Sequence, residues 1–196
     1  LDQWSFSSNE GDFIHITMVR TSGELNPEIR LISPTGKVVR HVWTWGESAE
    51  LVVNDAPESG TYRIIVGDAH INNTGNYLLR LAQAPQNFVV RPGDDGGPLT
   101  NGANHPGTIT LGDLDQWSFN ANAGSFIHLT IVSTSGELNP EIRLISPSGA
   151  VLRHSWTWED STQLVLQNAP ESGTYRVIAG DAHIDSTGGY LLTITW

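Results

Sequence analysis

The sequence of 196 residues contains no cysteine and only one lysine, Lys37. Without cysteine, disulfides, thiolate nucleophiles and cysteine-ligated zinc sites are excluded. A phosphate backbone is bound by clustered lysine and arginine side chains, but the sequence has no such cluster and its net charge is −11. We therefore expect neither nucleic acid nor an anionic membrane as a partner.

Long apolar runs and catalytic motifs are missing as well. No run approaches the about 18 apolar residues of a membrane-spanning helix, so membrane insertion is not expected. No G-x-S-x-G, H-E-x-x-H, P-loop or G-x-G-x-x-G pattern occurs, and the protein is not expected to be an enzyme. The sequence opens on "LDQWSF", which reads as a strand, so we interpret the chain as part of a larger, multidomain protein whose secretion signal would lie elsewhere.

What the sequence does contain is an internal repeat. Residues 1–83 align with residues 114–196 at a constant offset of 113, without a gap and with 56 of 83 positions identical. A unit of this size has enough residues for a core of its own, unlike the shorter repeat of a solenoid. Two domains of one fold are therefore predicted, the first over residues 1–87 and the second over residues 88–196.

The segment between the two copies ends in "GTITLGD", which alternates like a strand. We assign this strand to the second domain. The first domain has no matching segment in the sequence, so it is expected either to lack an edge strand or to borrow one.

The predicted fold class is all-β, with two tandem antiparallel jelly-roll-like β-sandwich domains. No window combines the helical period with capping residues, whereas strand-length runs recur at a spacing of about 8–12 residues, which is typical of sandwiches. In the second domain the expected strands cover residues 107–111, 115–119, 126–133, 140–145, 150–158, 163–166, 174–179 and 190–196.

Four motifs follow one another in the second copy and recur in the first from Leu1 onward. They are "GDLDQWSF" at 112–119, "NPEIRLISPSG" at 139–149, "ESGTYRVIAG" at 171–180 and "GGYLLTITW" at 188–196. Together they resemble the bacterial pre-peptidase C-terminal domain family, which is similar in architecture to the collagen-binding domains of bacterial collagenases. The resemblance implies a β-sandwich attached to a secreted bacterial protein, without catalytic activity. For some members it also implies Ca²⁺ near the N-terminal segment, or a bound polymer.

The sequence departs from that family at "RHVWTWGES" and its second copy "RHSWTWEDS", where the family often has an acidic or glycine-rich loop. Strand alternation places Val39, His41 and Trp43 on one face. This face is either the core face or an exposed aromatic platform. We interpret it as the core face, so that Trp43 and its counterpart Trp156 would be buried.

The second indole of each motif lies beside a turn, where burial and exposure are both open interpretations. An exposed indole can stack on a sugar or anchor a protein contact. The motif "GDAHI" is placed at the rim of the sandwich, where its aspartate and histidine could join this indole. The candidate ligand-binding residues are Trp43, Trp45, His41, Asp68 and His70 in the first domain, and Trp156, Trp158, His154, Asp181 and His183 in the second.

Other candidates are weighed against plainer interpretations. Trp4 and Trp117, in the shared "LDQWSF" block, are expected in the core. Asp94 and Asp95 stand in the glycine-rich turn "GDDGG", where carboxylates suit Ca²⁺ but a solvated turn is the alternative. The repeated histidines lack the local spacing of a zinc site.

Two functions are therefore carried forward. The first is a non-catalytic accessory module of a secreted or cell-surface bacterial protein, which binds an extracellular polysaccharide or fibrous protein through the tryptophan-containing end of each sandwich. The alternative is a calcium-stabilised structural spacer beside a secreted enzyme, with no ligand of its own and with every tryptophan buried.

Overall fold

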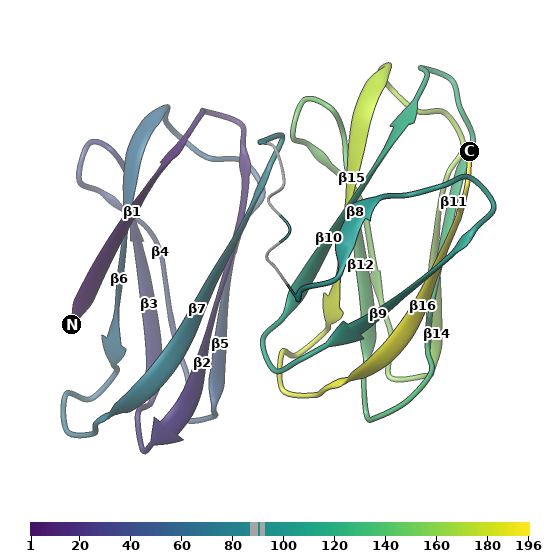
Figure 1. The fold of residues 1–196 in the computed structure, drawn as a ribbon. Coiled ribbons are helices and arrows are strands. Elements are labelled where there is room, and N and C mark those ends of the chain that lie inside the picture. The colour runs from purple at the N-terminus through teal and green to yellow at the C-terminus, as the bar shows by residue number, and fades with distance from the viewer. Residues whose placement is uncertain (87–89, 91–92) are drawn as a thin grey trace. The chain divides into compact units, whose positions relative to one another are not determined.

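The computed structural model describes residues 1–86, 90 and 93–196, and within these ranges every regular element is a β-strand (Figure 1). The chain divides into two compact units, Leu1–Gln83 and Ala84–Trp196. The boundary expected between residues 87 and 88 lies outside the described residues. The described part of the chain has no helix long and apolar enough to cross a membrane.

Unit 1 consists of two antiparallel sheets. Its strands are β1 (Asp2–Ser8), β2 (Phe13–Gly23), β3 (Pro27–Ile32), β4 (Val38–Trp43), β5 (Ser48–Val53), β6 (Gly60–Asp68) and β7 (Gly75–Ala84). One sheet has the order β1-β6-β3-β4 and the other β5-β2-β7. The crossovers between the sheets are those of a β-sandwich, and the predicted fold class is confirmed.

Unit 2 repeats this arrangement and adds two strands before it. Its strands are β8 (Gly96–Pro98), β9 (Asn104–Ile109), β10 (Leu114–Ala121), β11 (Ile127–Ser133), β12 (Pro140–Ile145), β13 (Val151–Trp156), β14 (Ser161–Leu166), β15 (Gly173–Asp181) and β16 (Gly188–Thr195). The sheet orders are β13-β12-β15-β10-β8 and β14-β11-β16-β9. All eight strands expected here are present, and only the short β8, which pairs with β10 in parallel, was missed.

The core of each unit lies between its two sheets. On β6, alternate side chains point inward, and Tyr62, Ile64 and Val66 are all buried. The central strand β3 is buried along almost its whole length, and so is its counterpart β12. The alternating burial along β6 is what two sheets packed through one face require.

The two units differ in the strands that pair with the edges of their sheets. In unit 2, β9 pairs with β16 and β8 pairs with β10, whereas β7 and β1 of unit 1 are edge strands among the described residues (Figure 1). As a result Trp117 is 6 % exposed but the equivalent Trp4 is 54 % exposed. The expectation of a buried Trp4 is therefore wrong, because among the described residues no strand pairs with the outer edge of β1 or of β7.

Candidate functional site

A β-bulge decides where the paired tryptophans point. Strand β4 pairs with β3 so that Arg40 is opposite Leu31 and Val38 is opposite Ile32, which leaves Val39 as the extra residue. A bulge of this kind shifts the alternation of side chains by one position. Val39 therefore packs against the core, while Trp43 faces outward.

The burial expected for Trp43 and Trp156 is therefore wrong. Trp43 is 49 % exposed and Trp156 is 43 % exposed, because the same bulge recurs between β12 and β13. The sequence gives no pattern that distinguishes a bulged strand from a regular one here. The strand also ends earlier than expected, at Trp156, so that Trp158 belongs to the following bend.

Beside each bulged strand lies a group of three aromatic rings, which we call the Trp–His cluster. It consists of Trp43, Trp45 and His70 in unit 1, and of Trp156, Trp158 and His183 in unit 2. Trp45 and Trp158 are each 67 % exposed. The structure thus brings together three of the residues proposed from sequence in each unit, although they come from separate segments.

The geometry of the cluster is nearly the same in both units. His70 stacks on Trp45 with ring centroids 4.1 Å apart, and Trp43 meets Trp45 edge-on at 5.6 Å. In unit 2 the corresponding distances are 4.3 Å and 5.5 Å. Edge-to-face and stacked contacts are the favoured arrangements of aromatic rings, so the indoles hold one another in place.

The loop that carries His70 is fixed by the carboxylate of Asp68. This carboxylate accepts hydrogen bonds from the backbone N–H groups of Asn26, His70, Asn72 and Asn73. Burial disfavours the charged form, but these four donors outweigh it and lower the pKa of Asp68 to about 2. Asp181 makes the equivalent bonds in unit 2 to Asn139, His183, Asp185 and Ser186.

The same loop contains a β-branched residue with positive φ, Ile71 at 60°, and Ile184 repeats it at 53°. This conformation costs a non-glycine residue about 1–2 kcal/mol. Both units keep it, and in both it follows the histidine of the cluster directly. The aspartate's hydrogen bonds therefore hold a loop that would otherwise relax, and they fix the position of the ring.

The remaining sequence candidates, His41 and His154, lie two residues before Trp43 and Trp156 on the same strand face. The Nε2 atom of His41 is 2.7 Å from Oε1 of Glu28, which also accepts hydrogen bonds from Arg30. Glu28 is buried and lies opposite Trp43 in the pairing of β3 with β4. The buried carboxylates beside the cluster are thus already engaged by protein donors, and what the cluster offers to a ligand is aromatic surface.

A separate group of carboxylates lies at the start of β10. Oxygen atoms of Asp94, Asp113 and Asp115 lie within 4.8 Å of one another, and the described part of the chain shows no other group of this kind. Asp115 is fully buried, and its Oδ1 has no hydrogen-bond partner among the described residues. This unmatched oxygen and the convergence of three carboxylates fit a divalent cation with oxygen ligands.

The pKa of Asp115 also reflects how closely these carboxylates approach one another. Burial, with the nearby charges of Asp113 and Asp94, raises the pKa of Asp115 to about 8. Asp95, the second metal ligand proposed from sequence, lies outside the group and accepts a hydrogen bond from the backbone N–H of Thr108 at 2.8 Å. Asp113 and Asp115 were not proposed from the sequence, although the Asp-x-Asp spacing of "GDLD" indicates two carboxylates at one end of a strand.

No family model matches the chain, and no curated protein does so either. Among solved structures, the pre-peptidase C-terminal domain of a collagenase from Bacillus anthracis is similar to it, with a TM-score of 0.44 and 14% identity. The match covers 52% of this chain and 96% of that one. A periplasmic inhibitor of g-type lysozyme from Aeromonas hydrophila is similar with a TM-score of 0.40 and 15% identity, over 52% of this chain and 96% of that one.

A third similar structure holds the tandem CBM51 modules of a family 98 glycoside hydrolase from Streptococcus pneumoniae. Its TM-score is 0.31 at 10% identity, over 97% of this chain and 80% of that one. The collagenase domain is named after the family that the sequence motifs resemble.

Proposed function

We propose that the protein is a non-catalytic binding module of a secreted or cell-surface bacterial protein, and that each Trp–His cluster binds an extracellular polysaccharide. The observation that carries the proposal is the repetition of one exposed three-ring arrangement in both units. Trp45 and Trp158 have the same exposed fraction and stack on a histidine in the same way. Exposed indoles are costly in water, and a sugar ring offers the apolar face that covers them.

The binding free energy expected from one cluster is small, and a second cluster on the same chain can add to it. Covering one indole face contributes about 1–2 kcal/mol at about 25 cal/mol per Å² of apolar surface. Because the rings already support one another, little rotamer freedom is lost when the ligand binds. Two such clusters on one chain raise the avidity for a polymer when both can engage it at once.

Calcium has a structural part in this proposal. The residues Asp94, Asp113 and Asp115 supply oxygen ligands, which Ca²⁺ prefers over nitrogen or sulfur. A bound divalent ion would offset much of the repulsion between three converging carboxylates and tie the segment before β8 to the start of β10. The cation would thus stabilise unit 2, and it would take no part in contact with the sugar.

The experiment is a pull-down and calorimetric screen against insoluble and soluble polysaccharides, with the double variant Trp45→Ala/Trp158→Ala. We expect binding to fall by at least tenfold in this variant. The matched control is Phe126→Ala, which removes an exposed aromatic side chain outside either cluster. Retention of collagen with loss in the double variant would replace sugar by fibrous protein as the ligand. Retention of a polymer to the same extent by the wild type and the double variant would place binding outside the clusters, and retention of no polymer by either protein would favour the spacer function.

A further inference from the structure

The two Trp–His clusters have the same geometry, but the charges around them differ. In unit 2 the loop before β12, the bend after β13 and the loop after β15 meet at the cluster. The first and the third are joined by a hydrogen bond from the backbone N–H of Glu137 to the carbonyl of Thr187, at 3.1 Å. The bend is joined to the start of β12 by a bond from the N–H of Thr157 to the carbonyl of Pro140, at 3.3 Å. Side chains on these segments therefore lie around the same aromatic rings.

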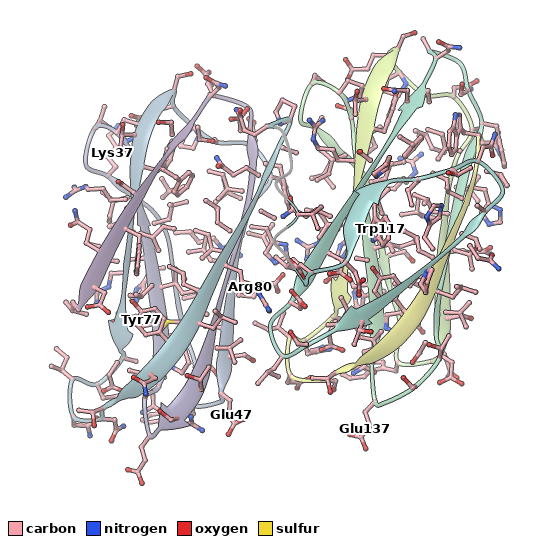
Figure 2. The ribbon with its side chains drawn as sticks, in the orientation of Figure 1. Lys37, Glu47, Tyr77, Arg80, Trp117 and Glu137 are labelled. Carbon is pink, nitrogen blue, oxygen red and sulfur yellow. The ribbon has the colours of Figure 1, made fainter. Side chains whose placement is uncertain are left out.

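These segments of unit 2 carry several carboxylates that face solvent. Glu159 and Asp160 form the bend after β13, Asp185 lies in the loop after β15, and Glu137 lies in the loop before β12. All four are exposed, and none forms an ion pair with another described residue. Figure 2 shows Glu137 at this end of unit 2. The exposed indoles of unit 2 are therefore surrounded by negative charge.

No cation of the same repeat offsets this charge. Residues 114–196 contain no lysine and three arginines, which lie on strands and not on these loops. Arg143 donates to the carboxylate of Glu141, while Arg153 and Arg176 donate to backbone carbonyls. Each guanidinium is thus held by the protein itself, and the carboxylates at the cluster keep their full charge.

The same place in unit 1 is close to neutral. Arg20 donates from Nη2 to the carboxylate of Glu47 at 3.0 Å and from Nη1 to the carbonyl of Leu25 at 3.2 Å. Glu47, labelled in Figure 2, is the counterpart of Asp160. With the offset of 113, unit 2 has Ser133, Glu159 and Asp185 where unit 1 has Arg20, Gly46 and Asn72. Each of these three differences makes the surroundings of the second cluster more negative.

We propose that the cluster of unit 2 binds a polymer of amino sugars with free ammonium groups, whereas the cluster of unit 1 does not distinguish charged from neutral sugars. The inference rests on the proposed polysaccharide binding and names the sugar class for one of the two clusters. A sugar ring that stacks on Trp158 brings its ammonium group close to the carboxylates of the neighbouring loops. The face of an indole also attracts cations.

The charge pattern disfavours the other ligand classes at this cluster. A sugar acid would be repelled by four carboxylates, and a neutral sugar gains nothing from them. A lysine-rich protein does offer ammonium groups, but it offers them on flexible stems whose rotamer freedom is lost on binding. An amino sugar carries its ammonium group on the same rigid ring whose apolar face covers the indole, so less freedom is lost.

The test uses the full chain and isolates each cluster in turn. Trp45→Ala leaves the cluster of unit 2, and Trp158→Ala leaves that of unit 1. Calorimetry at about pH 6, where the carboxylates are ionised, compares a glucosamine oligomer with an N-acetylglucosamine oligomer of equal length. Both clusters contain the same histidine, so its charge affects both alike. We expect Trp45→Ala to prefer the glucosamine oligomer at least fivefold, and Trp158→Ala to show about a twofold preference or less.

Variants of the charges then test the cause. In the Trp45→Ala chain, Glu159→Gln with Asp160→Asn should remove most of the preference and its dependence on salt, because exposed charge pairs are screened. Glu10→Gln with Asp55→Asn, at exposed positions outside either cluster, changes the net charge equally and should leave the preference in place. In the Trp158→Ala chain, Arg20→Ser frees Glu47 and should raise the preference of unit 1 for the charged oligomer.

The outcomes separate this inference from the proposed function. An equal preference in both single variants, an unchanged preference after neutralisation of the bend, or no binding of the glucosamine oligomer by Trp45→Ala overturns the inference. Polysaccharide binding still stands in each case if a polymer from the screen is lost in Trp45→Ala/Trp158→Ala. If no polymer or oligomer binds, both proposals fail. Oligolysine bound as tightly as the glucosamine oligomer, with the same dependence on Trp158, would replace the amino sugar by a cationic protein.

Discussion

His70 stacks on Trp45 with their ring planes inclined by 22°, and His183 stacks on Trp158 at 17°. The two rings of each pair come from different segments, one from the bend after the bulged strand and one from the loop after β6 or β15. The histidine therefore acts as a support that fixes the orientation of a 67 % exposed indole. Its contribution can be measured separately from that of the indole itself.

The first prediction concerns this support. His70→Ala together with His183→Ala should weaken polymer binding about three- to tenfold, because the indoles regain rotamer freedom that binding must then remove. His70→Phe with His183→Phe keeps a stacked ring and should retain most of the affinity. Isothermal calorimetry against the polymer found in the screen measures both, and an equal loss with phenylalanine and with alanine would show that the histidines contact the ligand through their nitrogens.

The second prediction concerns the loop that carries the histidine. Asp68→Asn should lower the free energy of unfolding of unit 1 by about 1–2 kcal/mol at pH 7, because an amide is a weaker acceptor for four backbone donors. The pKa of Asp68 is lowered to about 2, so its contribution is fully present above the unfolded pKa near 4 and is lost as pH falls toward 2.

The check is urea unfolding of the wild type and of Asp68→Asn between pH 2 and pH 7. The difference between the two proteins should shrink as the pH falls through this window. Asp55→Asn, at an exposed position in the turn before β6, serves as the control for a general change in charge. A difference that stays constant down to pH 2 would contradict the assignment of this stabilisation to the ionised carboxylate.

Much of the fold could be predicted from the sequence, and the reasons are physical. Alternating apolar residues and regular turn signals define strands such as β6, and the repeat fixes the number of units. The bulge at Val39 could not be predicted, because it depends on pairing with β3 and leaves no mark in local composition. The exposure of Trp4 could not be predicted from its copy Trp117 alone, because burial depends on the neighbouring strands, and among the described residues only β10 and β16 of unit 2 have such neighbours.

The residues of the candidate site could be named from the sequence, but their arrangement in space could not be predicted. "GDAHI" and the paired tryptophans were singled out, but the stacking of His70 on Trp45 depends on a loop held in a positive-φ conformation. The metal cluster shows the same division. The turn that contains Asp94 was recognised from the sequence. Asp113 and Asp115 were not, because they lie at the start of β10 and come close to Asp94 only in the folded unit.

The third prediction concerns metal binding by unit 2. Ca²⁺ should raise the Tm of the wild type, and Asp115→Asn should abolish most of that rise because it removes a buried ligand oxygen. Tb³⁺ provides a direct readout, since the hydroxyl of Tyr190 lies 2.7 Å from Asp115 and can transfer excitation to a nearby lanthanide. Asp95→Asn, outside the three-carboxylate group, is the matched control. Unchanged Tb³⁺ luminescence in Asp115→Asn would place the ion elsewhere.

The last prediction tests whether β9, which pairs with β16, is the strand that keeps Trp117 buried in unit 2. Gly107→Val in the full chain should displace β9, because the added side chain would collide with the buried ring of Tyr190. Trp117 should then become accessible to acrylamide, approaching the behaviour of Trp4, and unit 2 should lose more than about 2 kcal/mol of stability. Thr108→Val, on the exposed side of the same strand, should change neither quantity. If Trp117 stays shielded in Gly107→Val while unit 2 remains folded, β9 is not what buries it.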